Sequence, residues 1–201
     1  MRRALFLLFA LSTPLFAQER VSVGPLVGFY FASSEFVAPG PVLSSSALYK
    51  QRIAPALGVQ ATYWASSRFG LGASVAWSSS DVVPPGSAAD SSIPSSVRMA
   101  AAFMVLRVGS LERDLGVHLR LGLAQVAHLG EAFEPFEGAR PLGMMTGFES
   151  TLPLGSHLTG TAGFDLYLYS LQLTEGAFTY EKRRMVDAVA RVGLSWGFGE
   201  R

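Results

Sequence analysis

Two stretches near the C-terminus decide the fold: residues 158–169, LTGTAGFDLYLY, and residues 186–198, VDAVARVGLSWGF. In both, apolar residues recur at every second position. The first places Leu and Phe side chains on one face and Thr, Asp and Tyr on the other. The second sets Val186, Val192, Leu194, Trp196 and Phe198 against Asp187, Arg191 and Ser195. This period of two predicts β-strands with one apolar and one polar face.

The same alternation, followed toward the N-terminus, predicts eight strands. They are expected at residues 21–32, 53–65, 68–78, 97–109, 115–127, 141–152, 157–170 and 185–198. In residues 99–106 both faces are apolar, so the period alone does not orient that strand. We place Ala100, Ala102, Met104 and Leu106 outward, because this choice turns Arg107 inward. Beyond residue 17, no charge-free run reaches the roughly 18 residues that a membrane helix needs.

The connections between the expected strands alternate in length. Residues 33–52, 79–96, 128–140 and 171–184 form long connections, and residues 66–67, 110–114 and 153–156 form short ones. All long loops then lie at one end of an up-and-down sheet. Short turns at one end and long loops at the other are typical of outer-membrane barrels, with the short turns in the periplasm. An even number of strands places both termini on the periplasmic side.

Composition narrows the class further. Apolar residues make up 49% of the chain and charged residues only 15%, which excludes an extended disordered protein. Lys and Arg (16) balance Asp and Glu (15), so no basic field points to nucleic acid. The absence of Cys excludes disulfide scaffolds and thiol catalysis. Residues 1–17, with Arg2 and Arg3 before an apolar run, are expected to be a signal peptide, which leaves 18–201 as the barrel domain.

The direction of the apolar face separates a soluble barrel from a membrane barrel. A soluble strand usually exposes Lys and Glu, yet the chain has only two Lys, both in predicted loops. The polar faces carry Gly, Ser, Thr and Tyr instead. Large aromatic residues gather near the strand ends, as in the aromatic girdles of membrane barrels. We therefore predict an all-β, eight-stranded, antiparallel, up-and-down transmembrane β-barrel; a lipocalin-type soluble barrel is the alternative.

The last predicted strand carries the most specific motif. Residues 191–198, RVGLSWGF, place a polar residue, a glycine and two aromatics at Arg191, Gly193, Trp196 and Phe198. In this pattern and in its strand rhythm the chain resembles the small eight-stranded outer-membrane barrels of Gram-negative bacteria, the OmpA/OmpX/OmpW-like group. The resemblance implies that these four residues form the signal read by the barrel-assembly machinery. The sequence differs from the pattern of this group in one respect: Gly199, Glu200 and Arg201 follow the final aromatic residue.

Charged residues on the inward faces predict a packed polar interior. Eight strands leave room only for side chains, and an unpaired buried charge is costly. Three arginines and three carboxylates balance one another in number and are expected to form an interior charge cluster: Arg107, Arg120, Arg191, Glu149, Asp165 and Asp187. We interpret the cluster as structural. The alternative is a charged gate in a narrow pore.

Basic residues recur where the even-numbered strands begin, at the extracellular level. They are Lys50, Arg52, Arg98, Arg140, Lys182, Arg183 and Arg184. Because lipid phosphates of the outer leaflet lie at this level, we predict a rim that faces lipopolysaccharide. A belt of snorkelling side chains without a specific lipid is the alternative.

No pattern of residues indicates catalysis, a metal or a cofactor. The three histidines (118, 128 and 157) lack metal-ligand spacing, and Ser156-His157 has no evident acid partner. Residues 131–137, EAFEPFE, combine three carboxylates with two aromatics that we expect to be exposed; they suit a cation or protein ligand, or only a solvated acidic loop. We therefore predict a non-enzymatic envelope protein with long extracellular loops. The alternatives are a narrow channel for small or apolar solutes and a lipid A-modifying barrel enzyme.

Overall fold

A computed structural model describes residues 21–39, 46–84, 92–110 and 115–198. The predicted signal peptide therefore lies outside the described residues. Within them, no helix is both long and apolar enough to cross a membrane.

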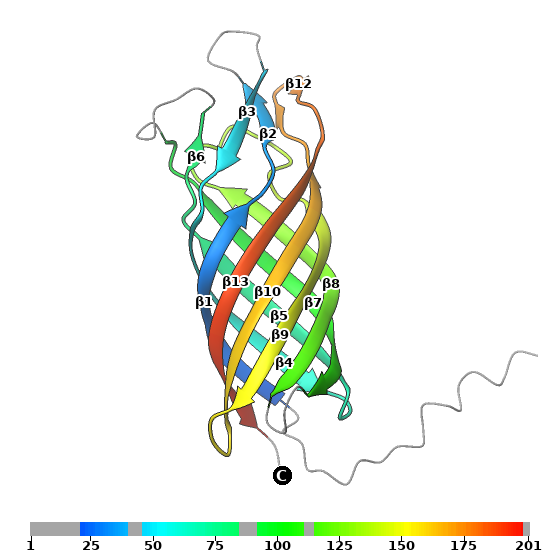
Figure 1. The fold of residues 1–201 in the computed structure, drawn as a ribbon. Coiled ribbons are helices and arrows are strands. Elements are labelled where there is room, and N and C mark those ends of the chain that lie inside the picture. The colour runs from blue at the N-terminus through cyan, green and yellow to red at the C-terminus, as the bar shows by residue number, and fades with distance from the viewer. Residues whose placement is uncertain (1–20, 40–45, 85–91, 111–114, 199–201) are drawn as a thin grey trace, which may run out of the picture.

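Eight long strands close into one antiparallel barrel, which Figure 1 shows as a tilted cylinder. They are β1 (Val21–Ala32), β4 (Ala54–Trp64), β5 (Phe69–Ser78), β7 (Ser96–Ser110), β8 (Gly116–Leu129), β9 (Leu142–Pro153), β10 (Leu158–Leu171) and β13 (Arg183–Phe198). Each strand pairs with its neighbours along the chain, and β1 closes the sheet against β13, with Val21 opposite Phe198. The predicted strands and fold class are confirmed, with boundaries that differ by at most two residues.

The two faces of the strands follow the predicted alternation. Outward side chains are mostly apolar and exposed, for example Phe29 on β1, Leu71 on β5 and Leu194 on β13. On β7 the outward residues are Ala102, Met104 and Leu106, with Ala100 in the same parity, so the ambiguous strand faces as predicted. A sheet with unpaired edges cannot exist in lipid, and closure pairs every strand on both sides.

Short and long connections separate to opposite ends of the barrel (Figure 1). The ends of β4 and β9 connect to β5 and β10 through short turns, on the side where β1 begins and β13 ends. The other end carries three short strands that pair as one sheet, β2 (Phe36–Pro39), β3 (Ser46–Gln51) and β6 (Val82–Val83). It also carries a hairpin of β11 (Thr174–Glu175) and β12 (Phe178–Thr179).

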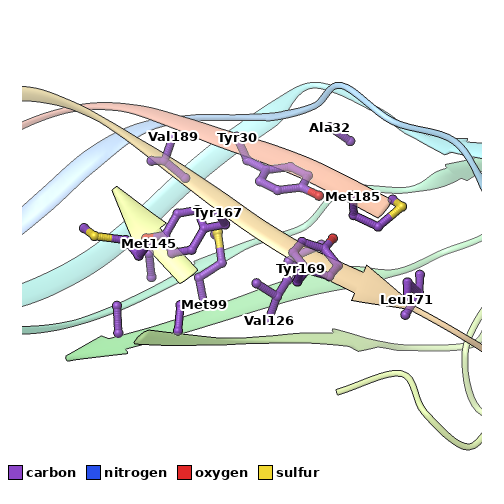
Figure 2. Close-up of a cluster of buried hydrophobic side chains, with 14 of the residues drawn as sticks. Tyr30, Ala32, Met99, Val126, Met145, Tyr167, Tyr169, Leu171, Met185 and Val189 are labelled. Atoms are coloured by element: carbon purple, nitrogen blue, oxygen red, sulfur yellow. The ribbon is translucent and has the colours of Figure 1, made fainter. Parts of the chain in front are cut away.

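The interior differs from the predicted polar packing at the end with the long loops. There the inward side chains are mainly apolar, and Figure 2 shows Met99, Met145, Tyr167, Tyr169 and Met185 projecting from several strands into the space between them. The sequence shows why: the inward positions of β7 are Val97, Met99, Ala101, Phe103 and Val105. The buried ion pairs lie in the half with the short turns, where the interior is polar as predicted, and Asp187 is the buried carboxylate of the other half.

Close approach of β1 and β13 limits which residues fit at the seam. A Cβ atom added at Gly28 would overlap the carbonyl oxygen of Ala190, whereas a Cβ atom at Gly109 would meet nothing within 4 Å. Overpacking a well-packed site costs about 1–3 kcal/mol.

We therefore expect Gly28→Ala to lower the free energy of unfolding by about 1–3 kcal/mol, and Gly109→Ala to change it much less. Equilibrium unfolding in urea, followed by heat-modifiable gel migration, measures both. Equal effects of the two variants would show that the seam is not tightly packed.

Candidate functional site

An ion cluster occupies the interior of the barrel in the half with the short turns. Its four central members come from four consecutive strands: Arg120 on β8, Glu149 on β9, Asp165 on β10 and Arg191 on β13. Cross-strand register brings them together, because Gly163 lies opposite both Glu149 and Arg191. All four side chains are buried, and Arg120 is only 2% exposed.

Asp165 is the centre of the cluster. Arg120 Nη1 donates to its Oδ1 at 2.9 Å and to its Oδ2 at 3.0 Å, and Arg191 Nε donates to Oδ2 at 2.6 Å. Arg191 also donates through Nη1 to Glu149 Oε2 at 2.7 Å. One arginine thus bridges two carboxylates on neighbouring strands. Charge-assisted bonds of this kind are the strong ones, and burial removes the competing water.

Three further side chains, from β4, β8 and β7, complete the cluster across the lumen. Gln60 of β4 donates to Glu149 Oε2 at 3.1 Å, and His118 Nδ1 lies 3.8 Å from Glu149 Oε1. The guanidinium of Arg120 stacks on the ring of Phe103, 3.8 Å from its centroid. Because β4 lies across the barrel from β9, the Gln60–Glu149 bond joins opposite walls.

Arg107 lies at the edge of this cluster. Its Nε is 3.3 Å from His118 Nε2, and its guanidinium stacks on Trp64, 4.9 Å from the ring centroid. The side chain is half-buried, and burial of a cation is offset here by the aromatic face. Arg107 therefore connects to the carboxylates through His118.

Asp187 does not belong to the predicted charge cluster. It is fully buried one layer nearer the long loops, where Tyr30 and Tyr169 donate to its Oδ2 at 2.8 and 2.6 Å. Tyr169 donates its hydroxyl proton to Asp187, so its oxygen can only accept from His128. In the 3.0 Å contact between His128 Nε2 and Tyr169 Oη, His128 is therefore the donor. The predicted six-residue grouping is thus corrected: Asp187 is held by hydroxyl groups, because strand register places it two residue pairs away from Asp165.

This second network extends to the long-loop end of the barrel. Gln51, at the end of β3, contacts the Tyr30 hydroxyl at 3.0 Å and donates to the Ser80 carbonyl at 3.4 Å. Sequence reasoning missed Gln51 and His128 because both fell in predicted loops. The alternation ending at residue 127 continues in fact to Leu129, which turns His128 inward with Val126.

Loop residues close the apolar half of the lumen. Phe133 is only 3% exposed and packs against Phe36 and His128, with ring centroids 5.2 and 5.0 Å away. The prediction of two exposed aromatics in residues 131–137 is therefore wrong at Phe133, because the barrel mouth offers an apolar surface that buries it.

One interior cavity, beside Asp165 and Arg191, has a volume of about 10 Å³, enough for about one water molecule.

The predicted basic rim divides into three parts. Arg140, Lys182 and Arg184 line one groove on the outer surface, beside β9, β10 and β13. Lys50, Arg52 and Arg98 lie outside that groove and are also exposed. Arg183 has the parity of inward Met185 and Asp187, its Nε is buried, and its Nη2 pairs with Glu181 at 3.1 Å. Its inclusion in a lipid-facing rim is therefore corrected.

The residues of the predicted assembly signal occupy two faces of β13. Arg191 points inward into the ion cluster, while Trp196 and Phe198 are exposed on the apolar outer face, at 51% and 54%. Gly193 is inward, where a Cβ would press on the Pro25 carbonyl at 2.5 Å. Each position thus has a structural role in addition to any role in recognition.

The histidines do not converge. His118 and His128 are buried in the two separate networks, and His157 lies in a turn, stacked against Trp196 with ring centroids 6.2 Å apart. No group of three or more potential metal ligands occurs among the described residues.

Known structures with the same architecture include three bacterial outer-membrane proteins. AlkL, determined in lipid bilayers, aligns with a TM-score of 0.66 at 14% identity, over 94% of each chain. OprG from Pseudomonas aeruginosa aligns at 0.55 and 12% identity, over 91% of this chain and 98% of OprG. Outer membrane protein W from E. coli aligns at 0.53 and 13% identity, over 92% of this chain and all of that chain.

The chain has the fold of the small eight-stranded outer-membrane β-barrels. No protein-family model matches its sequence, and no curated protein matches it significantly. At these identities the likeness concerns the fold, and function has to be argued from the chain itself.

Asp165 and Asp187 differ in their partners, which gives a test. Asp165→Asn leaves two buried arginines without their shared counter-ion, and breaking such a pair costs about 3–5 kcal/mol. Asp187→Asn keeps an oxygen for the two tyrosines and loses only the charge-assisted part, about 1 kcal/mol. Urea unfolding in detergent micelles compares them; similar losses would contradict the separation into two networks.

Proposed function

We propose that this chain is a non-enzymatic integral outer-membrane protein whose barrel is a closed anchor. Both termini face the periplasm, and the long loops form the functional surface at the cell exterior. One observation carries the proposal: buried side chains of the ion cluster, the Asp187 network and Phe133 occupy successive layers of the lumen in the described part of the chain. A filled lumen does not conduct, so interaction is left to the outer wall and the loops.

The loops support this proposal because they are structured in their described parts. The sheet of β2, β3 and β6 and the hairpin of β11 and β12 extend beyond the barrel (Figure 1). Among their exposed apolar residues are Leu48 and Phe178. Tyr180 stacks edge-on against Phe136, which joins the hairpin to loop 130–141. A folded surface of this kind suits an extracellular partner.

A second candidate, a narrow path for small apolar solutes, is favoured by one observation. The interior near the long loops is lined by Met99, Val126, Met145 and Met185, and methionine adapts its shape readily. Such a path requires Phe133 to move and must still pass the buried ion cluster. The third candidate, a lipid A-modifying enzyme, has weaker support, because His118 and His128 are enclosed within the barrel.

Electrical recording separates the closed anchor from the channel. The purified protein, reconstituted in planar bilayers, is expected to show no reproducible unit conductance. The variant Asp165→Ala, refolded in parallel, tests whether loss of the ion cluster opens a path. Regular conductance steps in the unaltered protein would overturn the closed-anchor proposal. Fractionation into the outer membrane and heat-modifiable migration test the location independently.

We further propose that the last strand is read by the barrel-assembly machinery through Phe198 and Trp196. Phe148 is a matched control, because it is also an outward aromatic and is 50% exposed. Phe198→Ala is expected to slow assembly in cells several-fold while folding into detergent stays unchanged, and Phe148→Ala is expected to leave assembly unchanged. Pulse-chase measurement of the folded form compares them, and equal delays would contradict a specific signal.

A further inference from the structure

One groove on the outer wall of the barrel is lined by both basic and apolar side chains. It lies beside β9, β10 and β13 at the end with the long loops and has a volume of about 720 Å³. Its upper part contains the cations Arg140, Lys182 and Arg184, and its lower part contains apolar side chains. Ser170 lies opposite Arg184 and next to Leu142 in the register of β9, whereas Leu168 pairs with Met144 and Val186 two residues further from the long loops.

Strand register sets the height of the groove. Ser170 lies opposite Arg184, and Leu168 lies opposite Val186, so the polar and apolar levels match on adjacent strands. Val186 and Phe198 are twelve residues apart, which at about 3.3 Å a residue and a tilt of about 40° spans roughly 30 Å. This span covers the apolar band of about 25–30 Å that a membrane barrel presents to lipid, so Arg184, beyond Val186, lies at the level of the lipid headgroups.

The three cations lack acidic partners of their own. In the part of the chain that the structure describes, neither Arg140, Lys182 nor Arg184 forms an ion pair with a carboxylate. The nearby acid Glu181 is engaged by Arg183 instead. Three exposed, unpaired positive charges in one groove attract an anion with more than one negative charge. Two of them are arginines, whose planar forks suit phosphate oxygens.

The apolar lower part narrows the choice of anion. Met144 and Leu168 lie opposite each other and are 51% and 41% exposed, on the face that lipid covers. A ligand that fits both levels needs phosphate groups directly joined to acyl chains. A free phosphate or a soluble nucleotide would leave the lower half of the groove unfilled.

We propose that this groove binds one phosphorylated glycolipid of the outer leaflet, lipopolysaccharide, through its lipid A part. The phosphates contact Arg140, Lys182 and Arg184, with Ser170 as a further donor, and the acyl chains lie on Met144, Leu168 and Val186. This inference rests on the proposed outer-membrane location. It replaces a uniform basic rim by a single site on one side of the barrel.

A matched pair of variants tests the site. Arg140→Gln with Arg184→Gln removes two charges from the groove, and Lys50→Gln with Arg98→Gln removes two charges from rim positions outside it. Each purified protein is titrated with lipid A in detergent, and native mass spectrometry counts the bound lipid. The groove variant is expected to bind lipid A roughly tenfold more weakly, and the control variant to bind like the parent.

Lipid chemistry gives a second, variant-free measurement. The parent protein is expected to bind dephosphorylated lipid A as weakly as the groove variant binds lipid A, and phosphatidylglycerol more weakly than lipid A. An equal loss of lipid A affinity in the two charge variants would contradict a specific site and indicate a belt of cations around the whole barrel. Equal binding of phosphatidylglycerol would overturn the glycolipid assignment. Heat-modifiable migration of every variant reports the folded barrel separately, so failure of the site leaves the anchor proposal standing.

Discussion

Closure of the backbone hydrogen bonds is the constraint on which the rest of the structure depends. In a hydrocarbon solvent each unpaired N–H or C=O group costs several kcal/mol, so a sheet is tolerated only when its first and last strands pair. Here β1 pairs with both β4 and β13, and this closes the eight-stranded sheet. Once the sheet is closed, the period of two sends alternate side chains to lipid and to an enclosed lumen.

An eight-stranded lumen has to be filled, and this barrel fills it in two ways. The half with the short turns contains charges, each desolvated and each matched by an opposite charge or an aromatic face. The half with the long loops contains Met, Val and Tyr, and it tolerates Asp187 only because two tyrosines donate to it. Because Asp187 and the ion cluster lie in separate layers, the carboxylate of Asp187 is kept away from the carboxylates of the cluster.

Sequence alone predicted the barrel because its signals are local and repeated. In every strand the alternation of apolar and polar residues indicates which side chains face outward. Even β7, where both faces are apolar, was oriented correctly by turning Arg107 inward. The site was predicted less completely, because partners inside a barrel depend on register between strands. Asp187 and Asp165 share a face, yet their register places them in different layers. Gln51 and Phe133 were missed as interior groups because their burial depends on segments that fold back over the mouth, and His128 was missed because β8 continues beyond its predicted end.

The same geometry explains why cations on the outer wall are informative. An outward position within the apolar band faces hydrocarbon, where a charge is strongly unfavourable, so outward arginines are expected only at its borders. Arg140 and Arg184 stand on either side of β10, at the border where the long loops begin. Arg183, one residue away, has the opposite parity and forms an ion pair with Glu181. The parity that separates Arg183 from Arg184 thus separates a charge satisfied within the protein from one left to an external anion.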